Sequence, residues 1–139
     1  MPQDYTQTVR SFYNAFARRD TEAFTALLDP QIEWSAAENF LYADHSPYVG
    51  VGAVATLILG RVLADWDAFT MNPAEILAGG EIVIASGRVQ GIFKANRAPI
   101  DAQFVQVFQF KDGRIAKVQM YTDTAQFKET IGRTRSVAT

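Results

Sequence analysis

The chain has 139 residues, of which 48% are hydrophobic and 20% charged, and it contains no cysteine. This length and balance are typical of one globular domain, and the missing cysteines exclude disulfides, thiolate catalysis and cysteine-based metal sites. The net charge is -2 and the 13 basic residues are scattered, so no basic stripe indicates a nucleic acid or a membrane as partner.

The N-terminal half of the chain predicts three helices and one strand. Tyr5, Val9 and Phe16 belong to an apolar stripe at helical spacing, which is typical of an amphipathic helix. Asp20 is a suitable N-cap for a short second helix. The elements expected here are a helix over 4–18, a helix over 20–28, a strand over 31–36, a loop over 38–50 and a well-buried helix over 52–66.

The C-terminal half predicts consecutive strands and a closing helix. Pro73 interrupts the first of these strands, which favours a sheet edge or a bulge, and Asp112-Gly113 indicates a tight hairpin turn. Two strands are expected over 67–78 and 81–93, and two more within 104–123, one on each side of this turn. The closing helix is expected over 124–131. Helices first and antiparallel strands last indicate one α+β domain, here residues 1–132, followed by a disordered tail over 133–139.

Nothing at the start of the chain resembles a secretion signal, because it lacks both a basic opening and an apolar segment. The apolar runs also fall far short of the roughly 20 residues that cross a bilayer. We therefore expect a cytoplasmic protein.

One face of the strand that begins at Phe104 combines aromatic rings with a single amide. Alternation places Phe104, Phe108 and Phe110 on that face together with Gln106. Burying an amide is costly unless another group pairs with it, so we expect a lined cavity. Gln106 would either donate to a ligand oxygen or pair with Tyr13 or a backbone group and so fix the core.

Five segments of the chain occur in an order that matches a known fold. They are residues 12–20, 27–34, 48–50, 108–115 and 121–125. Together they resemble the nuclear transport factor two-like superfamily, most closely its SnoaL-like branch, which is related to the ketosteroid isomerases. The resemblance implies a cone in which a strongly curved mixed or antiparallel sheet wraps around three helices, with an apolar pocket at the open end. It also implies a homodimer through the outer sheet face, which would present Gln103, Val105 and Val107.

The resemblance suggests catalytic residues, and it also argues against one catalytic mechanism, that of the ketosteroid isomerases. Ketosteroid isomerases need a general-base aspartate and a protonated aspartate, and Trp34 and Gln106 align with these positions, so we do not expect steroid isomerisation by that route. Tyr13 aligns close to the tyrosine donor of the isomerases. Asp123 falls near the acid/base aspartate of SnoaL-like cyclases.

Asp123 and His45 are the two candidate bases. Asp123 could take a proton next to a carbonyl or activate water, or it could simply cap the helix that follows. It reaches the cavity, together with Tyr121, only if a bulge reverses the alternation that places Met120 on the other face. His45 is the one histidine and so suits proton transfer near neutrality, although loop histidines are commonly exposed bystanders.

Apolar and aromatic side chains would line the cavity and contact the ligand. The expected ligand-binding residues are Phe16, Trp34, Phe40, Tyr48, Phe108, Met120 and Tyr121. A lone histidine without clustered carboxylates predicts no metal site, and no other cofactor is expected. The leading hypothesis is therefore a cofactor-independent enzyme that transfers a proton on a small, apolar oxygenated compound, as an isomerase, cyclase, dehydratase or hydrolase. The alternative is a non-catalytic ligand-binding or dimerisation module.

Overall fold

The computed structural model describes residues 5–133, so the tail expected over 133–139 lies outside the described residues except for Arg133. The helices are α1 Tyr5–Ala17, α2 Thr21–Ala26, α3 Val51–Ala53, the π-helix η1 Val54–Leu59, α4 Gly60–Asp65 and α5 Thr124–Gly132. The strands are β1 Leu28–Ser35, β2 Tyr48–Val49, β3 Trp66–Gly79, β4 Ile82–Phe93, β5 Pro99–Lys111 and β6 Arg114–Thr122.

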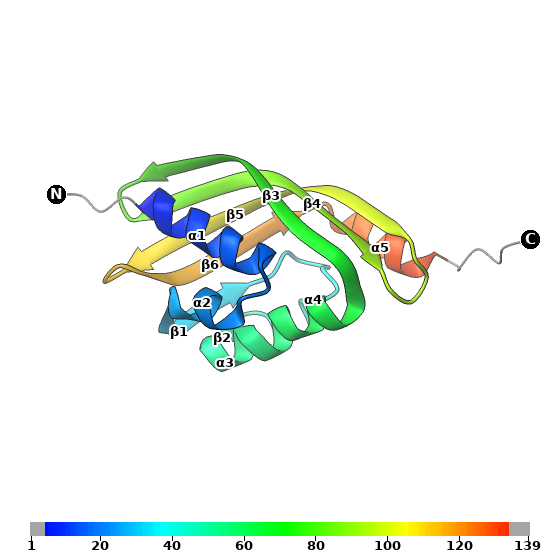
Figure 1. The fold of residues 1–139 in the computed structure, drawn as a ribbon, viewed down its shortest axis with the longest axis horizontal. Coiled ribbons are helices and arrows are strands. Elements are labelled where there is room, and N and C mark those ends of the chain that lie inside the picture. The colour runs from blue at the N-terminus through cyan, green and yellow to red at the C-terminus, as the bar shows by residue number, and fades with distance from the viewer. Residues whose placement is uncertain (1–4, 134–139) are drawn as a thin grey trace, which may run out of the picture.

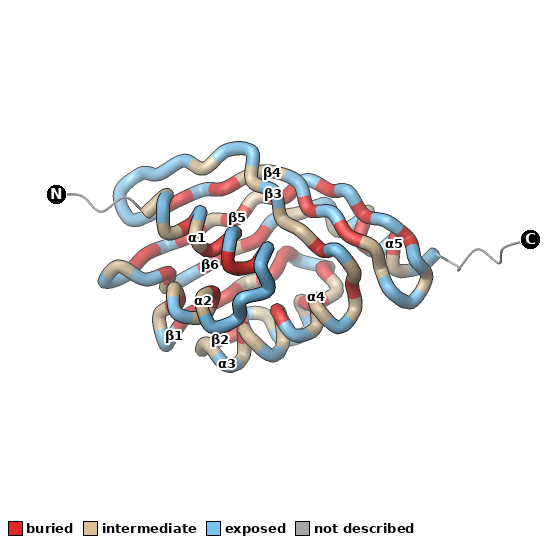
Figure 2. Tube along the Cα trace, in the orientation of Figure 1, coloured by how far each residue is buried: buried red, intermediate tan, exposed pale blue. Residues whose placement is uncertain are grey.

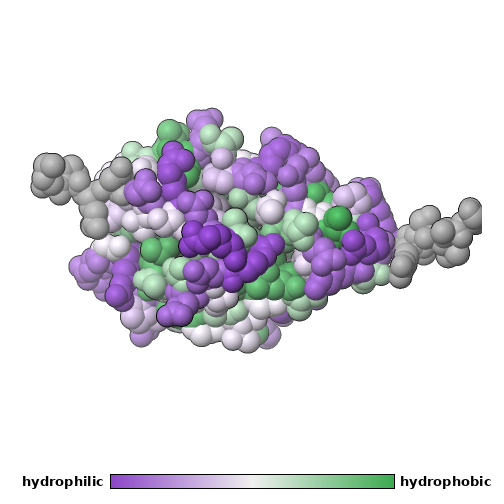
Figure 3. Space-filling view, in the orientation of Figure 1, coloured by the Kyte–Doolittle hydropathy of each residue, from purple (hydrophilic) through white to green (hydrophobic). Residues whose placement is uncertain are grey.

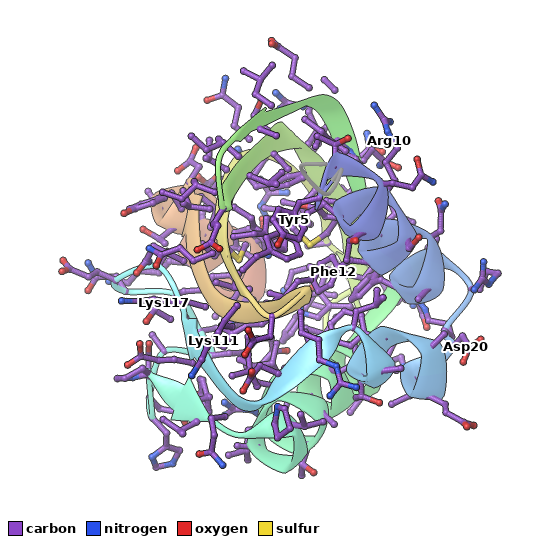
Figure 4. All side chains as sticks on the ribbon, turned by 90° about the vertical axis from the view of Figure 1, so that its left-hand side faces the viewer. Tyr5, Arg10, Phe12, Asp20, Lys111 and Lys117 are labelled. Atoms are coloured by element: carbon purple, nitrogen blue, oxygen red, sulfur yellow. The ribbon has the colours of Figure 1, made fainter. Side chains whose placement is uncertain are left out.

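The six strands form one mixed sheet in the order β2-β1-β6-β5-β4-β3. The β1–β6 pair is parallel and every other pair is antiparallel. Long strands arch over the helices in Figure 1, and the end-on view in Figure 4 shows the sheet curling around them. This architecture confirms the expected α+β fold with a curved sheet.

Local signals in the sequence account for several element boundaries. Asp20 caps α2, because its Oδ1 accepts a hydrogen bond from the amide of Ala23 at 3.0 Å. Asp112 and Gly113 have φ angles of 52° and 81°, as a two-residue turn with positive φ at both positions requires. Pro73 lies in β3, which is an edge strand whose register with β4 shifts between Pro73 and Glu75.

Several elements differ from the sequence prediction. The short strand β2 lies within the expected loop over 38–50, and β5 begins at Pro99 instead of residue 104. Strand β1 begins at Leu28 instead of residue 31, because α2 already ends at Ala26. The helical stretch over 51–65 is less buried than expected, with only Val54, Leu59 and Val62 fully enclosed. The residues on its solvent side are small and uncharged, such as Gly60. Because exposed helix faces normally carry charged residues, the sequence predicted more burial than the structure shows.

The core lies between the concave face of the sheet and the helices, where Figure 2 shows most of the buried positions. Phe12 of α1 is at its centre, with its ring 5.2 Å from that of Phe108 and 4.6 Å from that of Phe24.

On the face shown in Figure 3, hydrophobic residues form separate patches between hydrophilic ones. None of the helices within residues 5–133 is long and apolar enough to cross a membrane.

The bulge in β3 brings two backbones unusually close at Gly87, which pairs with Pro73. A Cβ atom at Gly87 would lie 2.0 Å from the carbonyl oxygen of Asn72. We therefore expect Gly87→Ala to lower the free energy of unfolding by at least about 2 kcal/mol, measured by urea denaturation, because the strand must shift. Gly52→Ala is the matched control, since a Cβ there meets no atom within 4 Å, and an equal loss in both variants would contradict this reading.

Candidate ligand pocket

A narrow cavity lies between the helices and the concave face of the sheet. The volume within which the centre of a water molecule can lie is about 40 Å³. In the same measure, one bound water needs roughly 10–15 Å³. The side chains around it come from helices, strands and a loop. They are Phe12, Phe16, Phe24, Trp34, Ala36, Phe40, Ile58, Leu59, Val62, Phe69, Met71, Gln106 and Met120.

The lining is apolar except at two side chains. Gln106 carries an amide and Trp34 an indole N–H, and none of the lining residues titrates near neutral pH. Phe12 points from α1 toward the sheet, whereas Arg10 and Asp20 point away (Figure 4). A site of this kind can hold an apolar molecule and orient it by one or two hydrogen bonds.

The amide of Gln106 is held by a buried hydrogen bond. The hydroxyl of Tyr13 donates to Oε1 of Gln106 at 2.6 Å, and the two residues are only 5% and 1% exposed. Burial raises the pKa of Tyr13 well above its ordinary value, so the phenol stays protonated and acts as a donor. Alternation along β5 places Gln106 on the concave face between the buried Phe104 and Phe108, so α1 and β5 meet at this bond.

The loop over 36–47 forms another wall of the pocket through Phe40. The centroid of the Phe40 ring lies 5.0 Å from that of Phe127 in α5 and 5.6 Å from that of Tyr42. The same loop carries Asp44, whose carboxylate accepts two hydrogen bonds from the guanidinium of Arg61 in α4, at 2.9 and 3.0 Å. This bidentate pair ties the loop to α4, whose Val62 also lines the pocket.

Two tyrosines extend this attachment, which we call the Arg61 clamp: Arg61, Asp44, Tyr42, Tyr48 and Asp65. The hydroxyl of Tyr42 donates to Asp65 at 2.7 Å, and that of Tyr48 donates to Asp44 at 2.8 Å. The Arg61 guanidinium also lies over the ring of Tyr42, 4.9 Å from its centroid. Hydrogen bonds from Arg61, and next from Tyr48, lower the pKa of Asp44 well below its usual range.

The structure brings some of the expected site residues together at the pocket. Tyr13 and Gln106 form the buried pair, and four of the expected ligand-binding residues line the cavity: Phe16, Trp34, Phe40 and Met120. Phe108 is buried beside the cavity and packs against Phe12. Tyr48 is buried too, but its hydroxyl belongs to the Arg61 clamp.

Tyr121 and Asp123 lie outside the pocket, as the alternation without a bulge and the capping alternative for Asp123 predict. The alternation that buries Met120 leaves Tyr121 56% exposed, because β6 keeps an unbroken register with β5 from Lys117 to Thr122. Asp123 caps α5, with Oδ1 accepting from the amide of Gln126 at 3.1 Å. His45 is also on the surface, with its Nε2 3.6 Å from the Asp44 carboxylate.

Several pocket residues were not expected from the sequence. Ile58, Leu59 and Val62 line the cavity from the helical stretch, and their spacing within a predicted helix was the available signal. The pairing of Asp44 with Arg61 joins residues 17 positions apart, and no local pattern indicates it. Among the residues the structure describes, no group of three or more His, Asp or Glu side chains is placed to hold a metal ion.

The curved mixed sheet and the helices together enclose an apolar pocket, which places the chain in the class of α+β proteins with an enclosed apolar pocket. The sequence profile of the SnoaL-like domain matches residues 9–118, so the chain belongs to the SnoaL-like domain family. A search of curated proteins gives no match.

Solved structures with the same fold include an NTF2-like protein from Burkholderia thailandensis E264, at 24% identity and a TM-score of 0.88 over 94% of this chain and 99% of that one. TerC, crystallised with polyporic acid, has 20% identity and a TM-score of 0.80, covering 91% and 97%. A protein with a ketosteroid isomerase-like fold from Catenulispora acidiphila DSM 44928, in complex with trimethylamine, has 13% identity and a TM-score of 0.78, covering 95% and 97%. At these identities, the likeness concerns the fold.

The lowered pKa of Asp44 predicts a dependence of stability on pH. A carboxylate whose pKa is depressed in the folded state stabilises the protein above its ordinary pKa of about 3.9, and this stabilisation is lost as the pH falls through the folded-state value. We expect the difference in unfolding free energy between wild type and Asp44→Asn to be constant above about pH 5 and to shrink below about pH 4. Urea denaturation from pH 7 to pH 2.5 measures it.

Glu38→Gln, in the same loop but outside the Arg61 clamp, is the control for that experiment. A difference between wild type and Asp44→Asn that stayed unchanged down to pH 2.5 would show that the clamp does not depend on the ionised carboxylate.

Proposed function

We propose that the protein binds a small, largely apolar molecule that carries a hydrogen-bond acceptor. The observation that supports this function is the apolar cavity in which Gln106 supplies an amide held by Tyr13. Such a combination provides hydrophobic affinity and one fixed point of orientation. Binding is favoured over catalysis because no acid or base lines the cavity within the described part of the chain.

A second candidate function is proton-transfer catalysis on the same molecule, without a cofactor. Its support is the SnoaL-like family and the ketosteroid isomerase-like fold of one similar structure. In this case Gln106 would polarise the substrate oxygen and either Asp123 or His45 would take the proton. Both of these groups lie on the surface, so the loop over 36–47 or the end of β6 would have to move before chemistry could occur.

Binding can be tested with a panel of small cyclic ketones and hydrocarbons in a thermal-shift assay. A ligand at about one hundred times its dissociation constant should add roughly 2.7 kcal/mol to the free energy of unfolding. Ala36→Leu should abolish the shift because the larger side chain fills the cavity that Ala36 lines, whereas Ala78→Leu on an exposed part of β3 should retain it. Equal shifts in both variants would place the ligand elsewhere.

The same panel separates the two candidates. Turnover of a bound ketone by wild type, and its loss in Asp123→Asn or His45→Ala, would establish catalysis and replace simple binding as the function.

We also propose that two copies of the chain associate through the outer face of the sheet. Apolar side chains are contiguous there across four strands, since Leu77 lies opposite Ile84, Ile84 opposite Val107, and Val105 opposite Tyr121. Leu77, Ile84 and Tyr121 are 61%, 43% and 56% exposed. Exposed apolar areas of this kind mark association surfaces, and a second copy offers a surface of the same character.

Sedimentation velocity at tens of micromolar protein tests this association. We expect wild type to sediment as a dimer and Ile84→Lys as a monomer, because a charge would be buried without a partner. Ala26→Lys, which adds the same charge on the exposed end of α2, should leave the dimer intact. A monomeric wild type would contradict the proposal.

A further inference from the structure

We infer that Tyr13 determines that the pocket presents a hydrogen-bond donor to its ligand. The pocket therefore selects small carbonyl compounds over ligands of the same shape that lack an acceptor. This inference rests on the proposed binding function and specifies its ligand class. Tyr13 does not line the cavity; it acts through Gln106 as a positioning residue.

The first step is the orientation of the amide. The two ends of a glutamine side chain differ, because the oxygen accepts and the nitrogen donates. The Tyr13 hydroxyl donates to Oε1 at 2.6 Å, and the raised pKa of this buried phenol keeps its proton in place. In the reversed amide the nitrogen could donate to the phenol oxygen, but within residues 5–133 the hydroxyl proton would then have no other acceptor and Oε1 would lose this donor, so the observed orientation is the stable one.

The second step concerns the amide nitrogen. Gln106 is 1% exposed and lines the cavity, yet within residues 5–133 its Nε2 makes no hydrogen bond to the protein. Nor is this nitrogen among the fully enclosed atoms that lack a partner, so it borders open space. A buried N–H group without an acceptor destabilises its surroundings, and the space that it borders is the cavity.

The third step is the balance of donors and acceptors on the lining side chains. The only other nitrogen among them is the indole of Trp34, which can donate but not accept. The one side-chain oxygen already accepts from Tyr13, and the thioethers of Met71 and Met120 are only weak acceptors. The lining side chains therefore offer N–H groups and no strong acceptor that lacks a donor, which favours a ligand carbonyl and disfavours a ligand whose only polar group is a donor.

Matched ligand pairs test this selectivity by isothermal titration. Cyclohexanone and methylenecyclohexane have the same shape, but only the ketone accepts a hydrogen bond, and furan and pyrrole form a smaller acceptor–donor pair. We expect wild type to bind cyclohexanone at least about tenfold more tightly than methylenecyclohexane, and furan more tightly than pyrrole. Gln106→Leu should bind the two members of each pair about equally.

Tyr13→Phe tests the role of Tyr13 itself. Without the phenol the amide can rotate, so the ratio of the furan and pyrrole affinities should fall toward one, whereas a purely structural role would weaken both ligands together. The double variant Tyr13→Phe with Gln106→Leu leaves neither polar group unpaired. It serves as the folded reference if the single substitution unfolds the protein, and it should show no selectivity.

Each outcome decides between the claims. Equal affinities of wild type for cyclohexanone and methylenecyclohexane would overturn the inference and leave the binding function intact, and tighter binding of pyrrole than furan would show the amide reversed. Binding of none of the four probes would overturn both the inference and the proposed function. Unchanged selectivity in Tyr13→Phe would show that another group orients Gln106.

Discussion

The hydrogen bond between Tyr13 and Gln106 joins residues that are 93 positions apart, one on the first helix and one at the middle of the sheet. Both groups are buried among phenylalanine rings, where an unpaired amide or phenol costs about 1–3 kcal/mol. Satisfying the pair fixes how α1 lies against β5. The same amide is one of the two side-chain polar groups that line the cavity.

The walls of the cavity differ in how they are held. The sheet side is a hydrogen-bonded ladder of long antiparallel strands, whereas the loop over 36–47 has no regular secondary structure and is tied to α4 by the Arg61 clamp. Much of this attachment is partly exposed to solvent, so it resists opening less than a packed core does. Phe40 stands on this loop and lines the cavity, which makes the loop the wall best suited to admit a ligand.

Features set by local chemistry could be predicted from the sequence. The caps at Asp20 and Asp123, the turn at Asp112-Gly113 and the edge position of Pro73 depend on neighbouring residues, and the structure shows each of them. The pairing of Gln106 with Tyr13 was one of two alternatives, since a buried amide requires a partner but alternation does not identify it.

Features set by distant contacts could not be predicted. Asp44 and Arg61 meet only because the loop folds back on α4, and the solvent side of the 51–65 stretch is apolar through small residues. The inward or outward position of Tyr121 depends on where β6 is irregular. That irregularity lies near Ile115, so Tyr121 stays outside.

A double-mutant cycle on Tyr13→Phe and Gln106→Leu measures the central interaction most directly. The free energies of unfolding of wild type, both single variants and the double variant give the coupling between the two side chains. If the bond organises the pocket, each single substitution destabilises the protein and the double variant recovers part of the loss, with a coupling of at least about 1 kcal/mol. Additive losses, with no coupling, would contradict the account.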